Sequence, residues 1–151
     1  MINVEAQALA YAVEIGAIEI SEIQAWADEE ILGLAIPNEE ILMLSTEDKI
    51  PSIISLLHRL GADADNRLVG HVVYEYLLKA LKKGSISHER AAEAIIRLAQ
   101  NSRSPSEEAE KASSYFEDAF YLAFEEISGS RSIVVAELEE HLRMYGSSNF
   151  T

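Results

Sequence analysis

The chain has 151 residues, of which 48% are apolar and 25% are charged, and its formal net charge is −14. This length and composition suit one globular domain with a substantial core, and they exclude a disordered chain. The absence of cysteine excludes disulfide scaffolds, thiolate zinc sites and cysteine nucleophiles. No apolar run is long enough to span a membrane, and the first residues include acids and no early basic residue. We therefore expect a soluble, cytoplasmic protein.

The charge is unevenly distributed along the chain. Residues 1–48 hold eleven acids and no Lys or Arg, residues 49–105 hold nine basic residues and five acids, and residues 106–151 hold ten acids and three basic residues. The acidic outer thirds argue against direct binding to nucleic acid or to an anionic membrane, because both require a positive field. They favour a basic protein partner. They are also expected to fold over the basic middle third.

Four helices are expected in the first 60 residues. The first is capped by Asn3 and ends at Gly16. The pattern Ser21-Glu22-Ile23-Gln24 is typical of a capping box and predicts the start of the second helix. Pro37 predicts the start of a short third helix with Leu42 among its core residues. A helix begun at Thr46 would have Pro51 in its second turn, where proline lacks the N–H donor that a helix needs. The fourth helix is therefore expected to start near Pro51, or Thr46 to Ile50 to form a separate turn before it.

The stretch 65–84 (DNRLVGHVVYEYLLKALKKG) predicts a central helix around which the other helices pack. Ten of the fourteen residues from Leu68 to Leu81 are apolar, and a helix that is apolar nearly all round is buried nearly all round. Asp65 or Asn66 can cap its start, and Gly84 supplies its end.

Three further helices are expected after Gly84. Ser87 can cap the first of them, which runs to Gln100. The pattern Ser104-Pro105-Ser106-Glu107 combines a capping box with proline at the first helical position and begins a long helix to about Ser128. The aromatic stripe of that helix is assigned to the core and consists of Tyr115, Phe116, Phe120 and Phe124. The last helix is expected over residues 132–145.

These patterns predict an all-α fold of about seven or eight helices, arranged as αα-hairpins around the central helix of residues 65–83. Residues 1–146 are expected to form a single domain, and residues 147–151 a polar tail. The turns Gly16-Ala17-Ile18 and Gly84-Ser85-Ile86 are alike. They leave two interpretations open: a repeated hairpin, or the short glycine-ended turns that any compact helical domain needs.

The sequence contains no pattern typical of an active site or a metal site. Its four histidines do not form His-x-x-x-His or Glu-x-x-His pairs, and no phosphate-binding loop or Gly-x-Ser-x-Gly motif is present. His71 and Glu75 stand one helical turn apart, but two ligands do not define a metal site. Adjacent glutamate pairs lie opposite apolar stripes, where solvation explains them. We therefore expect no enzyme activity, no cofactor and no metal.

The favoured function is that of a non-enzymatic binding protein whose acidic face takes a basic protein partner. The analogy is with acidic inhibitors such as toxin-immunity proteins, and it rests on charge and size alone. Tyr121 belongs to the candidate face because it shares an exposed row with two glutamates. Two alternatives remain open: a structural or regulatory homo-oligomer, and a small-ligand-binding protein or enzyme with a pocket near Trp26 or His71. The candidate face consists of Asp28, Glu29, Glu30, Glu39, Glu40, Glu117, Tyr121 and Glu125.

Overall fold

The computed structural model describes residues 2–33, 38–124 and 131–146, with the side chains of residues 121–124 left out. These residues form eight helices and no strand, which confirms the predicted all-α class and helix number. No helix among them is long and apolar enough to cross a membrane. The helices are α1 (Ile2–Glu14), α2 (Ile20–Gly33), α3 (Glu39–Leu44), α4 (Ile50–Leu60), α5 (Asn66–Lys83), α6 (His88–Gln100), α7 (Glu107–Phe124) and α8 (Arg131–Tyr145).

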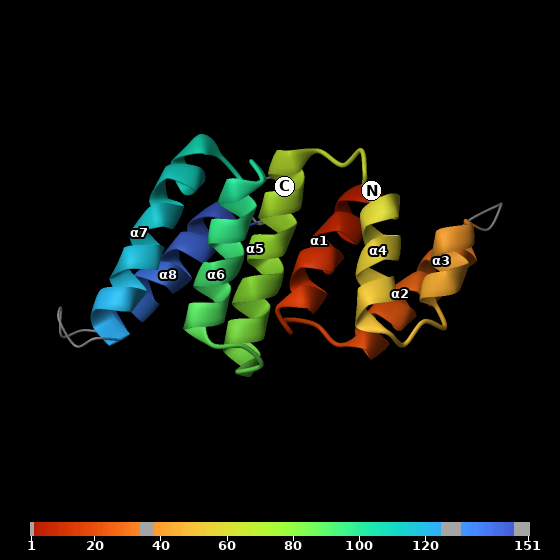
Figure 1. Ribbon diagram of the computed structural model, residues 1–151, viewed down its shortest axis with the longest axis horizontal. Helices are drawn as coiled ribbons and strands as arrows, with labels where there is room; N and C mark the ends of the chain where they lie inside the picture. The colour runs from red at the N-terminus through yellow and green to blue at the C-terminus, as the bar shows by residue number, and fades with distance from the viewer. Residues whose placement is uncertain (1, 34–37, 125–130, 147–151) are drawn as a thin grey trace.

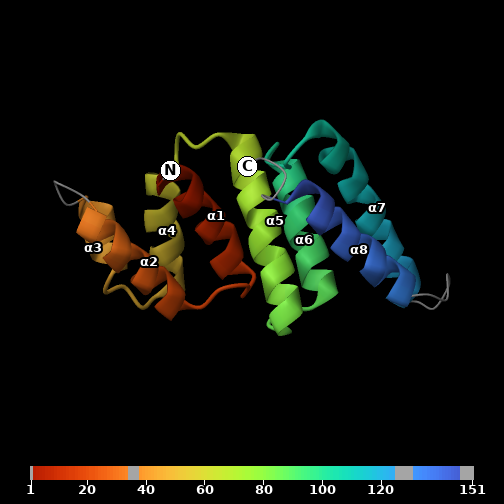
Figure 2. The same ribbon diagram turned by 180° about the vertical axis from the view of Figure 1, so that it is seen from behind.

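Helix α5 lies in the middle of an elongated molecule, as the sequence predicts. Helices α1 to α4 lie on one side of it and α6 to α8 on the other (Figures 1 and 2). One hydrophobic cluster joins α1 and α5 to α6, α7 and α8, and a second joins α1 to α2, α3 and α4. Tyr76 of α5 packs against both clusters. Helix α1, which supplies buried residues to both clusters, therefore joins the two cores, and α5 touches the second core through Tyr76.

Local signals define both ends of α5. The Asp65 side chain accepts a hydrogen bond from the backbone N–H of Leu68, at 3.0 Å, so Asp65 is the N-cap. Gly84 ends the helix with a φ of 74°, a left-handed conformation that glycine adopts without steric cost. Tyr74 and Leu77 are completely buried between these ends. Burial in the middle of the molecule follows directly from the long apolar run in the sequence.

The two similar turns share one hydrogen-bond pattern. The N–H groups of Gly16 and Ala17 bond to the carbonyls of Val13 and Ala12, at 3.2 and 2.8 Å, and the turn after α5 repeats this arrangement at Gly84. Both are Schellman motifs. The helices that follow diverge: α6 folds back along α5, whereas α2 leaves α1 and packs on α3 (Figure 1). The likeness is therefore that of the turns, and it does not extend to the packing of the hairpins.

A third Schellman motif ends α6 and contains a serine where glycine would be favoured. Ser102 has a φ of 57°, and the N–H of Arg103 bonds to the carbonyl of Leu98 at 2.8 Å. We expect Ser102→Gly to raise the free energy of unfolding by about 0.5–1 kcal/mol, because relief of the left-handed strain outweighs the added flexibility of the unfolded chain. Urea unfolding followed by circular dichroism measures this. Ser114→Gly, at an exposed helical position of α7, should instead lower stability.

Four of the predicted helix starts are wrong by two residues. Helix α1 begins at Ile2, so Asn3, its expected cap, lies inside the helix, and α3 begins at Glu39 after an Asn38 cap instead of at residue 37. Helix α2 begins at Ile20, and the Glu22 carboxylate accepts from the N–H of Glu19 at 2.7 Å, so Glu19 occupies the cap position that Ser21 was expected to fill. Helix α7 begins at Glu107, where Ser106 caps the N–H of Ala109 at 3.1 Å. Ser104, the expected cap, is instead buried in the connection before the helix. Other starts are confirmed: Ser87 caps α6, and α4 begins next to Pro51.

Two side chains assigned to the core are exposed. Leu42 on α3 is 43% exposed, because the short helix turns Ile41 and Leu44 inward and leaves Leu42 on its outer side. Tyr115 on α7 is 47% exposed, while Phe116 and Phe120 are buried as predicted. The predicted side-chain position of Phe124 lies outside the described residues.

Ion pairs join the acidic outer thirds of the sequence to the basic middle third, as expected from the charge distribution. Glu14 of α1 pairs with Arg97 of α6 at 2.9 Å, and Glu22 of α2 lies 4.0 Å from Lys83 of α5. From the other side, Glu110 of α7 lies 3.8 Å from Arg67. These pairs are partly exposed, so each contributes little to stability. They use only a few of the acids and leave most of the negative charge on the surface.

Candidate partner-binding surfaces

The structure divides the predicted acidic face between two ends of the molecule. The residues of α2 and α3 lie at one end, and α7 lies at the other (Figure 1). The expectation that they form one continuous face is therefore wrong. Glu117 is exposed on α7. The side chain of Tyr121 and the whole of Glu125 lie outside the described residues.

The end formed by α2 and α3, here called the acidic end, combines carboxylates with exposed apolar side chains. Leu32 is 87% exposed, and Leu42 and Met43 lie beside the acids of α3. The surface is held in place from below, where Ile23 and Ile41 are buried in the second cluster. The Asn38 side chain caps α3 by accepting a hydrogen bond from the N–H of Ile41, which fixes the position of the acidic first turn of this helix. The acids of this end are Asp28, Glu29, Glu30, Glu39 and Glu40.

The five carboxylates of the acidic end form no ion pair or side-chain hydrogen bond with any described residue. The five acids belong to residues 1–48, a segment without Lys or Arg, so no basic side chain close in sequence can pair with them. The acids of α1 differ: Glu14 reaches Arg97, and Glu5 accepts from the indole N–H of Trp26 at 2.8 Å. A cluster of like charges without counter-charges creates a negative potential that attracts a basic surface.

Helices α7 and α8 form a second surface, an open groove with a volume of about 680 Å³. This volume is within the range of about 300–1,000 Å³ that is typical of ligand sites. Ile133 is 60% exposed and Met144 is 53% exposed, and Tyr115 lines the groove from the opposite helix. Ala112 and Ala136 leave space between the helices. Most of the surface that lines the groove is apolar.

A cluster of rings supports the groove from below. His141 lines the groove and is 5.2 Å from Phe116 and 5.0 Å from Tyr145, measured between ring centroids. Its Nε2 forms a hydrogen bond of 2.8 Å with the hydroxyl of Tyr74 in α5. Burial lowers the pKa of His141 to about 4 and raises the pKa of Tyr74, so both side chains are neutral near pH 7. The base of the groove is therefore uncharged.

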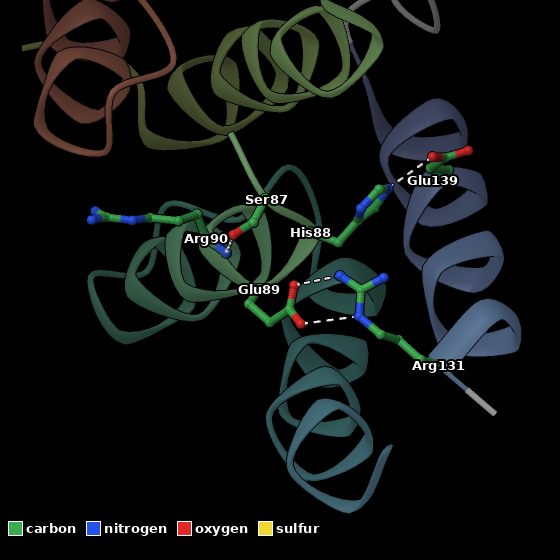
Figure 3. Close-up of polar contacts among 6 residues, drawn as sticks. All are labelled: Ser87, His88, Glu89, Arg90, Arg131 and Glu139. Atoms are coloured by element: carbon green, nitrogen blue, oxygen red, sulfur yellow. Dashed lines mark hydrogen bonds and ion pairs between the residues drawn. The ribbon is translucent and has the colours of Figure 1, made fainter. Parts of the chain in front are cut away.

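Polar contacts with α6 fix the position of α8. Arg131 makes a bidentate contact with Glu89, with distances of 2.8 and 3.2 Å, and Nε2 of His88 lies 2.9 Å from Glu139 (Figure 3). The contact with Arg131 lowers the pKa of Glu89. Ser87 caps α6 by accepting from the N–H of Arg90, which places His88 and Glu89 at the start of the helix (Figure 3). One face of α8 is thereby used for internal contacts, while the face toward the groove remains open.

Two glutamates of α8 line the groove beside its apolar side chains. The hydroxyl of Tyr115 donates to both oxygens of Glu137, at 2.9 and 3.0 Å, and this hydrogen bond raises the pKa of Tyr115. Glu140 pairs with Arg143 one turn further along. Sequence reasoning missed this surface because it assigned Tyr115 to the core and gave Ile133 and Met144 no role. One sequence signal could have indicated this surface. Ile133 is apolar but lies outside the buried stripe of Val134, Leu138 and Leu142 on the same helix.

The described residues contain no group of three or more His, Asp or Glu side chains that could hold a metal ion. The lining of the α7–α8 groove includes neither Trp26 nor His71, near which a pocket was considered. The chain matches no protein-family model, and no curated protein and no solved structure matches it.

Proposed function

We propose that the protein is a non-enzymatic binding protein that takes a basic protein partner on its acidic end. The observation that carries this proposal is the set of five carboxylates on α2 and α3 that form no ion pair with a described residue, beside the exposed side chains of Leu32, Leu42 and Met43. Apolar contacts supply affinity at an interface, and complementary charge supplies orientation and a fast encounter. An inhibitor that covers a basic surface of another protein would need this combination.

A charge-matched pair of variants tests the proposal. The end variant removes two first-turn glutamates, one further glutamate and one aspartate, through Asp28→Asn, Glu29→Gln, Glu39→Gln and Glu40→Gln. The control variant also removes three glutamate charges and one aspartate charge, but from exposed positions on α6 and α7. Two of its glutamates again lie in the first turn of a helix. Its substitutions are Glu93→Gln, Glu107→Gln, Glu108→Gln and Asp118→Asn. Both variants have the same net charge. Any difference in partner binding between the two variants therefore depends on where the charges were removed.

The measurement has two stages. Proteins retained from a lysate of the source cell are identified by mass spectrometry, and each basic candidate is then produced and titrated against the three forms by calorimetry. We expect the end variant to weaken binding by about tenfold or more and the control to change it much less. Equal weakening by both variants would show that only the net charge matters and would contradict a site at the acidic end. Unchanged binding by the end variant would do the same.

The two alternatives predict different results. A homo-oligomer would sediment as a larger species, and raising the salt concentration to about 0.5 M would not dissociate it. A small-ligand-binding protein would show a rise in melting temperature with a metabolite or metal, since a ligand at about a hundred times its dissociation constant adds about 2.7 kcal/mol to stability. Either result without a protein partner would replace the proposal.

A further inference from the structure

The apolar side chains of the α7–α8 groove follow a helical stripe. On α8 the lining residues Ile133, Ala136, Glu140 and Met144 are spaced three or four positions apart, so they lie along one face of the helix. From Ile133 to Met144 this face extends over about 16 Å, or three turns. Tyr115 and Phe116 form the opposite wall on α7. A groove of this form accepts another helix, whose apolar residues at positions i, i+3, i+4 and i+7 enter it.

The charge around the groove decides which helix can occupy it. Helices α7 and α8 carry eight acidic and three basic residues, and Glu137 and Glu140 are part of the lining. A second copy of this chain would bring another net charge of −14 toward the same surface, and an anionic membrane would be repelled in the same way. A helix with an apolar face and basic flanks meets both requirements, since its apolar side chains enter the groove while its Lys or Arg residues reach the glutamates.

The groove is already formed before anything binds. Arg131 and Glu139 hold α8 against the first turn of α6 (Figure 3). The rings of His141, Phe116 and Tyr145 pack against one another beneath the groove. A site that needs no rearrangement avoids the cost of ordering its own side chains. We propose that the α7–α8 groove binds a basic amphipathic helix of a protein partner. This surface is distinct from the acidic end, at the opposite end of the molecule, and the inference does not depend on binding there.

A synthetic peptide tests the groove directly. The probe is a fluorescein-labelled helical peptide of about 14 residues, with Leu at the i, i+3, i+4 and i+7 positions and Lys elsewhere. Its comparison peptide has Glu in place of Lys. We expect fluorescence anisotropy to show saturable binding of the Lys peptide and no binding of the Glu peptide. We expect the double variant Ile133→Ser, Met144→Ser to weaken binding of the Lys peptide by about tenfold or more.

The exposure of both side chains makes this variant a fair test, since neither residue belongs to the buried core. Equal circular dichroism spectra and unfolding midpoints check that the fold is retained. Leu32→Ser is the matched control, because Leu32 is an exposed apolar residue at the acidic end. The control should bind like the unmodified protein. Binding that falls only with Leu32→Ser or with the charge-reduced acidic end would overturn the groove while supporting the proposed function.

Two other outcomes would overturn the inference as well. Equal binding by all variants would show that the peptide is held by general surface charge. A concentration-dependent dimer that Ile133→Ser, Met144→Ser dissociates, seen by sedimentation velocity, would show that a second copy covers the groove instead. Loss of peptide binding in the groove variant together with a monomeric unmodified protein supports the inference, whether or not the acidic end binds a partner.

Discussion

Replacing Gly70 by alanine is expected to lower the free energy of unfolding by about 3 kcal/mol or more. A Cβ on Gly70 would lie 2.1 Å from the carbonyl oxygen of Arg103, 2.7 Å from the nitrogen of Pro105 and 2.8 Å from the carbonyl carbon of Ser104. All three atoms are backbone, so no flexible side chain can move aside. The clash outweighs the gain of about 1 kcal/mol that alanine otherwise brings to a helix.

The connection between α6 and α7 has little freedom to retreat from this clash. Arg67 donates to the carbonyl oxygen of Ser104 at 2.9 Å, and Arg103 donates to Asn66 at 3.0 Å and to the hydroxyl of Tyr11 at 3.1 Å. These bonds tie the connection to both α5 and α1. Because α7 begins immediately after it, Gly70 also helps to position one wall of the groove.

Urea unfolding followed by circular dichroism measures the effect of Gly70→Ala. Gly33→Ala is the control, since nothing lies within 4 Å of a Cβ at that helix end. We expect the control to be neutral or slightly stabilising. If Gly70→Ala were as stable as the unmodified protein, the close approach of the α6–α7 connection to α5 would be incorrect.

The sequence was sufficient to predict those parts of the fold that local chemistry determines. The apolar run of α5, its Asp65 cap and its Gly84 end are all signals within a single stretch of chain, and each was confirmed. The same is true of Ser87 at the start of α6. Helical periodicity and caps act over a few residues, so a single sequence contains them completely.

Errors occurred where tertiary packing or another local signal competed with the cap that sequence reasoning chose. Ser104 has the right neighbours for a cap, but the connection that contains it packs against Gly70, and the cap role passes to Ser106. At α2, Glu22 reaches back to the N–H of Glu19, so the helix starts before the serine that sequence reasoning chose. A long-range contact decided the first case, whereas a second local signal, the bond between Glu22 and Glu19, decided the other.

The candidate site was harder to predict than the fold. Asp28, Glu29 and Glu39 are exposed as expected, and Glu30 and Glu40 are half-buried. Whether these acids meet Glu117 depends on the order in which the helices pack, which no local pattern encodes. Tyr115 belongs to an aromatic stripe that normally indicates a core. Among the described helices, α7 packs substantially on α6 and α8 alone, and none of them covers the outer side of the α7–α8 pair, where Tyr115 is exposed.

Acidification is expected to destabilise the protein through His141. Because burial lowers its folded-state pKa to about 4, the unfolded chain, with a pKa of about 6.5, binds the proton first as the pH falls. The stability that the neutral imidazole contributes is therefore complete above about pH 6.5. It decreases as the pH falls from there toward 4, by at most about 3 kcal/mol.

The experiment compares two pH values above the isoelectric point of about 4.6, where a protein of low net charge tends to precipitate. Between about pH 7.5 and pH 5.5, His141 should account for a loss of about 1 kcal/mol in the free energy of urea unfolding. Carboxylates also respond to pH, so the quantity of interest is the difference between the unmodified protein and His141→Gln. We expect the substitution to remove the contribution of His141, which makes the variant less sensitive to acid.

A packing control separates titration from loosening of the ring cluster. Phe116→Leu disturbs the contacts of His141 with Phe116 but removes no titratable group, so it should lower stability while keeping the pH dependence of the unmodified protein. If His141→Gln and the unmodified protein lost the same stability on acidification, the histidine would have to be hydrated in the folded state. The base of the groove would then be open to water. It would be less apolar than the ring cluster indicates, and therefore a poorer binding site for an amphipathic helix.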